Sequence, residues 1–96
     1  MGLPEEYSLS QNYSNPFNPV TTIKYTIPSN VNSELSNVKI VVFDMLGKVM
    51  TEFVNEFKEP GTYEVKYDAS RLTSGVYFYR LISGSFIDTK KMMLLR

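Results

Sequence analysis

The chain has 96 residues, of which 43% are hydrophobic and 14% aromatic, and its ten basic and ten acidic side chains cancel. This composition predicts one folded domain and excludes disorder, which needs low hydrophobicity and high net charge. The balanced charge gives no electrostatic reason to expect nucleic acid or an anionic membrane as the main partner.

The first segment, "MGLPEEYSLS", lacks the charged and apolar regions of a signal peptide. We interpret residues 1–6 as an expression remnant or a linker from an upstream cargo. No apolar run approaches the roughly 20 residues that span a bilayer. If the protein works outside the cell, we expect its export signal to lie on a longer parent chain.

The stretch "NYSNPFNP", Asn12 to Pro19, follows a weak first strand at Tyr7–Leu9. Proline removes a backbone donor and restricts the residue before it, so this stretch does not suit a regular strand ladder. We expect a rigid loop in which Phe17 plugs one end of the fold and the Asn side chains bond the local backbone.

The next segments alternate apolar and polar residues at period two, as strands do. "TTIKYTI" places Ile23, Tyr25 and Ile27 on one face. "VKIVVFD", Val38 to Asp44, is apolar on both faces and suits a central strand. "GKVMTEFV" follows across Met45-Leu46-Gly47, and the pair predicts a hairpin.

Helix is nearly absent from the pattern. The best candidate, Asn55–Glu59, is short and is stopped by Pro60-Gly61. "TYEVKYD" then predicts another strand with one wet face, because its apolar residues alternate with charged ones. The inward residues of that strand are Tyr63, Val65 and Tyr67.

The strongest strand signal is "GVYFYRLIS", Gly75 to Ser83. Arg80 sets its faces, so that Phe78 points outward and is a candidate for contact with a parent domain or partner. The residues expected inward are Tyr77, Tyr79 and Leu81, and those expected outward are Val76, Phe78 and Arg80. The spacing of Leu72, Gly75 and Tyr77 matches a tyrosine corner.

A last strand is expected over Phe86–Leu95. The total is about seven short strands with turn signals between them, which predicts an all-β, immunoglobulin-like antiparallel sandwich. We expect the last strand to pack through Ile87, Met93 and Leu95 or through the alternate residues.

Candidate chemistry is sparse, because the chain contains no histidine and no cysteine. That absence removes disulfides, the usual zinc ligands and every His-paired nucleophile. Asp44, Asp68 and Asp88 lie at or near strand ends and are expected to cap turns. A calcium site built from Asp44 or Asp68 with turn carbonyls is the alternative. We expect no catalytic residue, no cofactor and no metal.

Four blocks occur in a fixed order: "NYSNPFNPVTTIKYTIP", "VVFDMLGKVM", "GTYEVKYDASRLTSGVYFYRL" and "TKKMMLLR". Together they resemble the type A C-terminal sorting domain of the type IX secretion system of Bacteroidota, also called the Por secretion tail. The resemblance covers residues 7–96. The family is also similar to immunoglobulin-like domains of flagellar hook-capping proteins.

The resemblance implies a non-catalytic module at the end of a larger exported cargo. The parent chain would pass through the periplasm and meet the outer-membrane translocon. A sortase would then remove the domain, and the cargo would be secreted or held at the cell surface. The cleavage site would lie near or before the N-terminal edge of the domain.

The resemblance also assigns residues. The terminal basic pair and the apolar residues after it are the positions that the machinery would read: Lys90, Lys91, Met92, Met93, Leu94 and Leu95. The structural motif residues are Asn15, Pro16, Phe17, Asn18, Pro19, Asp44, Leu46, Gly47, Gly75, Val76 and Tyr77.

An unpaired edge on the last strand would be a template for a partner that adds a strand. Lys90 and Lys91 would keep that edge from self-association, although an edge-strand dimer is also compatible with it. Two other functions stay open from the residues alone. One is a surface immunoglobulin-like module that contacts polysaccharide or protein through Phe78, and the other is a structural spacer.

Overall fold

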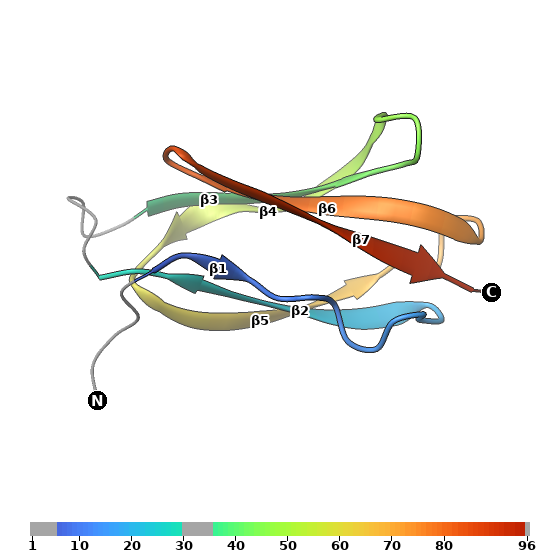
Figure 1. Cartoon of the computed structure of the whole chain (residues 1–96), viewed down its shortest axis with the longest axis horizontal. Helices are drawn as coiled ribbons and strands as arrows, with labels where there is room; N and C mark the ends of the chain where they lie inside the picture. The colour runs from blue at the N-terminus through green and yellow to red at the C-terminus, as the bar shows by residue number, and fades with distance from the viewer. Residues whose placement is uncertain (1–5, 30–35, 96) are drawn as a thin grey trace.

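A computed structural model gives the structure of residues 6–29 and 36–95. Figure 1 shows two stacked β-layers, one of three strands in the order β1-β2-β5 and one of four in the order β4-β3-β6-β7. The strands are β1 (Ser8–Leu9), β2 (Val20–Ile27), β3 (Ser36–Phe43), β4 (Val49–Lys58), β5 (Gly61–Asp68), β6 (Gly75–Ser83) and β7 (Phe86–Leu94).

All neighbouring strands run antiparallel. This architecture confirms the predicted all-β sandwich of about seven strands and is compatible with the immunoglobulin type. Within the part of the chain that the structure describes, no helix could cross a membrane.

The core lies between the two layers and follows the predicted alternation. Ile23, Tyr25 and Ile27 of β2 are fully buried, while Lys24 between them is exposed. β3 is apolar on both faces and lies between β4 and β6, which confirms that it is a central strand. Burial of these large apolar side chains is the main favourable term that holds the layers together.

The weak helix candidate at Asn55–Glu59 does not form a helix. Residues up to Lys58 belong to β4, and Asn55 pairs with Lys39 of β3. The five residues are too few to nucleate a stable helix alone. Pairing along the whole of β3 therefore determines their conformation.

The faces of β6 are as predicted, because Tyr77, Tyr79 and Leu81 are buried. The Tyr77 hydroxyl donates to the Thr73 carbonyl oxygen at 2.7 Å. The predicted tyrosine corner is thus present. It ties the start of β6 to the connection that precedes it.

The last strand packs through the alternate set of residues. Met92 and Leu94 are fully buried, whereas Ile87, Met93 and Leu95 are 61%, 38% and 51% exposed. The register explains this choice, because Met92 lies opposite Tyr77, which faces the core. Residues directly opposite each other in neighbouring strands point to the same face of a sheet.

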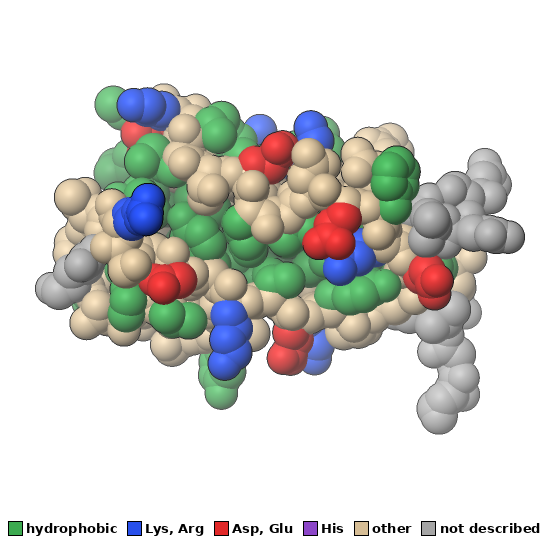
Figure 2. Space-filling view, turned by 180° about the vertical axis from the view of Figure 1, so that it is seen from behind, with side chains coloured by type: hydrophobic (Ala, Val, Ile, Leu, Met, Phe, Trp, Pro, Cys, Tyr) green, Lys and Arg blue, Asp and Glu red, His purple; other side chains and the backbone are tan. Residues whose placement is uncertain are grey.

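The two long sides of the sandwich differ. On the β1/β7 side, Tyr7 stacks on Phe86 with ring centroids 4.6 Å apart, and the Tyr79 hydroxyl donates to the Ser10 carbonyl at 2.6 Å. On the other side the last strands are β4 and β5, joined by the ring contact of Phe53 with Tyr67. Figure 2, seen from behind Figure 1, shows apolar side chains along the middle of the molecule between the layers.

Candidate functional site

The terminal basic pair is divided between the two faces of β7. Lys91 is exposed and alternates with Met92, so it shares the outer face with Met93. Lys90 lies on the same side as Met92 and is half-buried at the rim. The two lysines therefore do not form one basic patch in the folded domain.

The four apolar residues after the lysines divide in the same way. Met92 and Leu94 belong to the hydrophobic core, and Met93 and Leu95 remain accessible. Of the six expected sorting residues, the folded domain thus presents Lys91, Met93 and Leu95 most openly.

The outer face of the four-stranded sheet carries several apolar side chains. Phe43 lies opposite Phe78, which lies opposite Lys91, and Val76 lies opposite Met93. The Arg80 guanidinium lies 4.6 Å from the centroid of the Phe43 ring. The alternation in β6 predicted that Phe78 lies on this face. The role of Phe43 was not predicted, although the two-sided apolar pattern of "VKIVVFD" was a signal for it.

The turn between β3 and β4 holds an exposed apolar tip in place. Asp44 Oδ1 accepts from the backbone N–H groups of Leu46 and Lys48, each at 2.9 Å. Gly47 has φ of 85°, a conformation that favours glycine. Leu46 is 93% and Met45 68% exposed. The Asp44 carboxylate thus caps the turn, as predicted, and the turn presents Leu46 to solvent.

Two motif blocks that are distant in the sequence meet beside this turn. A pocket of about 290 Å³ is lined by Asp44 and Leu46 from one block and by Gly75, Val76 and Tyr77 from the other. A neighbouring pocket of about 280 Å³ includes Gly47 together with Phe43, Phe78 and Arg80. The fold therefore collects the turn, the start of β6 and the outer face of β7 at one end of the four-stranded sheet.

The proline-containing loop contacts the last strand directly. Phe17 is 2% exposed and belongs to the core, which confirms its predicted role as a plug. Its N–H donates to the Met93 carbonyl at 3.0 Å, and its carbonyl accepts from Leu95 N–H at 2.9 Å. Asn15 Oδ1 accepts from Met93 N–H at 3.0 Å.

The rest of the loop supports this arrangement. Asn12 is buried, and its Nδ2 donates to Ser14 O and Thr21 Oγ1, as expected for local bonding. The Pro19 carbonyl accepts from Ala69 N–H. Pro16 and Asn18 are exposed. The bond from Asn15 to β7 is a correction to the expectation that the loop's asparagines act locally.

The expectation of an unpaired outer edge on β7 is wrong for its C-terminal half. The Met93 carbonyl accepts from Phe17 N–H, and Met93 N–H donates to Asn15 Oδ1. Gln11 Nε2 donates to the Lys91 carbonyl at 2.6 Å. Nearer the start of β7, the Asp88 carboxylate accepts from Thr89 N–H at 2.9 Å. A partner that contacts this end of β7 would meet side chains rather than a bare strand edge.

The titratable groups with shifted pKa values lie in the core rather than on this surface. Burial raises the pKa of Tyr25 and of Tyr79 to about 12.

Asp68 Oδ1 accepts from Ser70 N–H, so Asp68 caps a turn as Asp44 does. Within the described residues, no group of three or more acidic side chains gathers as a metal site would require.

Comparison with known families places these features in context. A family model described as "Secretion system C-terminal sorting domain" matches residues 11–95. Comparison with curated proteins finds no significant match. The matched residues include the loop that plugs the core, the capped turn, the tyrosine corner and the whole of β7. The chain therefore belongs to the family of C-terminal sorting domains of the type IX secretion system.

Proposed function

We propose that this domain is the non-catalytic sorting signal of a larger exported protein and that the secretion machinery binds it in the folded state. Its family membership identifies it as a sorting signal for type IX secretion. The observation that carries the finer proposal is the division of the terminal motif into buried and accessible side chains.

The reading surface that we propose consists of Lys91, Met93, Leu95, Val76 and Phe78. A partner can contact only side chains that the folded domain exposes, and Lys91 and Met93 lie opposite Phe78 and Val76. Met92 and Leu94 are fully buried and act through stability instead. The apolar side chains around Lys91 would contribute burial energy to binding of a partner, and the Lys91 charge would fix the partner's orientation.

Lys90 has a different role in this proposal. A charged side chain that points inward on an edge strand discourages pairing with a second copy, because pairing would bury the charge. Lys90 is half-buried on the core side of β7, which is an edge strand of its sheet. We therefore expect it to oppose the edge-strand dimer rather than to contact the translocon.

The remaining steps follow from the same proposal. The parent chain crosses the periplasm, the outer-membrane translocon binds the domain, and a sortase cuts before β1. The cargo is then released or held at the cell surface. The domain supplies binding and folding stability to these steps, and the reacting groups belong to the sortase.

An export assay tests the reading surface. The chain is fused to a periplasm-directed fluorescent reporter in a bacterium with the secretion system, and the reporter in the medium is measured. We expect the double variant Lys91→Gln, Met93→Gln to reduce export about tenfold, which corresponds to about 1.4 kcal/mol of lost recognition.

Lys66→Gln is the matched control, because Lys66 is exposed on β5 of the opposite sheet. Circular dichroism and the Tm of each purified domain show whether it remains folded. Normal export of the folded double variant would refute the proposed surface. Deletion of residues 90–96 is not informative, because it also removes Met92 and Leu94 from the core.

A second candidate function is contact with polysaccharide. One observation favours it: Phe43, Phe78 and Arg80 line the same pocket on the outer face. Aromatic rings beside a hydrogen-bond donor suit a sugar ring. Binding on a glycan array that is lost in Phe78→Ala would support this function, and an array without signal would exclude it.

A further inference from the structure

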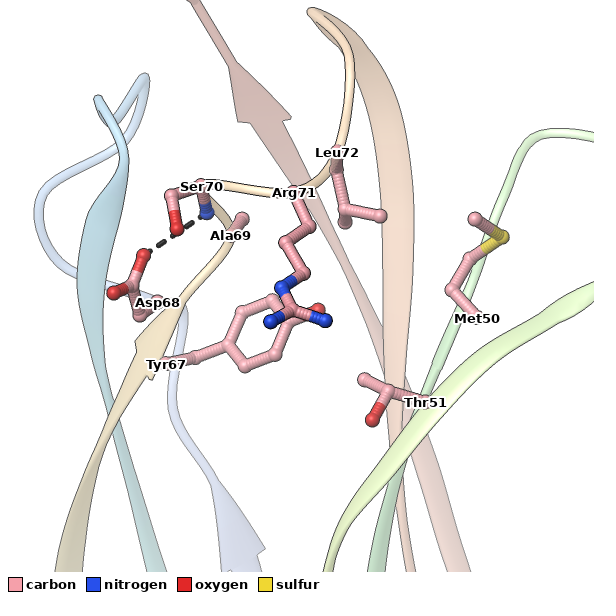
Figure 3. Close-up of a pocket in the computed structure, with 8 residues that line it drawn as sticks. All are labelled: Met50, Thr51, Tyr67, Asp68, Ala69, Ser70, Arg71 and Leu72. Carbon is pink, nitrogen blue, oxygen red and sulfur yellow. Dashed lines mark hydrogen bonds between the residues drawn. The ribbon is translucent and has the colours of Figure 1, made fainter.

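A pocket of about 420 Å³ lies on the β4/β5 side and shares Met50 with the pocket beside the capped turn. Figure 3 shows its lining: Met50 and Thr51 from β4, and Tyr67, Asp68, Ala69, Ser70, Arg71 and Leu72 from the end of β5 and the connection to β6. The family assignment gives this pocket no role.

Tyr67 is the unusual member of the lining. Tyr67 is 8% exposed, and its ring packs on the Phe53 ring with centroids 4.8 Å apart. Among the described residues its hydroxyl has no hydrogen-bond partner, yet that oxygen is not sealed from solvent as the Tyr25 hydroxyl is. The phenol directs a donor into the pocket, and burial raises its pKa above the ordinary value.

Arg71 supplies the charge of the pocket. It extends from the β5–β6 connection across the front of the Tyr67 ring in the view of Figure 3. Within the described part of the chain it forms no ion pair. Asp68, the one acidic residue in the lining, is turned to the far side of β5, where its carboxylate accepts from Ser70 N–H at 2.9 Å.

The geometry points to a binding site for a carboxylate, carried by an acidic residue of an extended peptide. The Arg71 guanidinium and the Tyr67 hydroxyl are donors of the kind that a carboxylate accepts from. Met50 and Leu72 add apolar side chains to the lining. This inference does not rest on the sorting role, since none of the residues Lys91, Met93, Leu95, Val76 and Phe78 lines this pocket.

A peptide fits the site better than a sugar acid because of the strand beside it. β4 is the edge of the four-stranded sheet, and its residues Met50 and Thr51 line the pocket. An extended peptide can add to such an edge through backbone hydrogen bonds and place every second side chain toward one face. One acidic side chain flanked by apolar residues would then reach Arg71.

NMR titration of the ¹⁵N-labelled chain tests the site. The probe is N-acetyl-Val-Asp-Val-amide, and N-acetyl-Val-Asn-Val-amide is its neutral counterpart. We expect saturable shifts at Met50, Thr51 and residues 69–72 with the acidic peptide, and affinity at least about tenfold weaker for the neutral one. Methyl glucuronide forms the third arm and is expected to bind no better than the neutral peptide.

Two variants test separately what the Arg71 charge and the Tyr67 hydroxyl contribute to binding. Arg71→Gln should weaken binding about tenfold or more, and Tyr67→Phe about threefold to tenfold, because it removes the oxygen but keeps the ring on Phe53. Lys66→Gln removes one positive charge from the exposed face of β5 and should leave affinity within about twofold. Unfolding of a variant would be visible in the same spectra.

Four results would overturn the inference. The first three are the absence of shifts with the acidic peptide at about 10 mM, equal binding of the two peptides, and binding that Arg71→Gln leaves unchanged. Tight binding of methyl glucuronide without binding of the peptide would also overturn it, in favour of an acidic sugar.

Discussion

Phe17 and Leu94 form a parallel bridge between the proline-containing loop and the last strand. Both side chains are in the core, at 2% and 0% exposure. The loop therefore holds β7 at the end that carries the sorting motif. Because the loop is hydrogen-bonded to β7, a change that destabilises the loop should also displace Lys91 and Met93.

Phe17→Ala should destabilise the domain strongly. Truncating a buried phenylalanine removes burial energy and leaves a cavity, at a cost of about 3–5 kcal/mol. Urea unfolding followed by circular dichroism measures the change. Tyr13→Ala in the same loop is the control, because Tyr13 is 76% exposed and should change stability by about 0.5 kcal/mol or less. A cost for Phe17→Ala no larger than that of the control would contradict the plug.

Met92→Ala and Met93→Ala should differ although the residues are adjacent. Met92 is fully buried, so its truncation should cost about 2–5 kcal/mol. Met93 lies on the outer face, and its truncation should cost less than about 1 kcal/mol. Urea midpoints of the two variants provide the test. The reverse order would mean that β7 packs through its other face.

Tyr79→Phe and Tyr25→Phe form a second matched pair, since both residues are fully buried. Tyr79→Phe loses the 2.6 Å bond to the Ser10 carbonyl and should cost about 1 kcal/mol. The Tyr25 hydroxyl is buried with no partner in the described residues, so Tyr25→Phe should be neutral or stabilise by up to about 1 kcal/mol. Equal losses in thermal or urea unfolding would show that the Tyr25 hydroxyl is bonded in solution.

Stability should fall at alkaline pH. Burial raises the pKa of Tyr25 and of Tyr79 to about 12 in the folded state, compared with about 10 in the unfolded chain. Between these values the unfolded chain releases protons that the folded domain retains, so the free energy of unfolding decreases as pH rises. Below the unfolded pKa this contribution is fully present.

Urea unfolding at a series of pH values between about 8 and about 12 checks the alkaline loss. The double variant Tyr25→Phe, Tyr79→Phe should show a shallower decline than the natural chain, because two of the titrating groups are gone. A wild-type stability that stays constant from about pH 10 to about pH 12 would contradict the raised pKa values.

Much of the fold could be predicted because strand alternation is a local property. Ile23, Tyr25 and Ile27 share a face wherever the strand lies, and Arg80 among aromatic residues identifies the outer face of β6. The tyrosine corner was also accessible, since its bond joins Tyr77 to Thr73 within four residues. The weak helix candidate at Asn55–Glu59 belongs mostly to β4, because pairing with β3 overrides a weak local preference.

The candidate site could be predicted only in part. The sequence named the terminal motif, but Lys, Met and Leu occur on both of its alternating faces, so either face could have been the inner one. Pairing of Met92 with Tyr77 decided it. The pocket between the capped turn and the start of β6 was not predictable, because its two walls come from separate parts of the chain.

By itself, the sequence determined that the chain forms paired strands, which residues alternate along them, and to which family it belongs. The tertiary structure alone decided that the proline-containing loop bonds to β7, that the two terminal lysines point to opposite faces, and that Tyr67 and Arg71 line one pocket. The physical reason is distance along the chain. Alternation arises between neighbouring residues, whereas register and pockets arise when distant segments pack together.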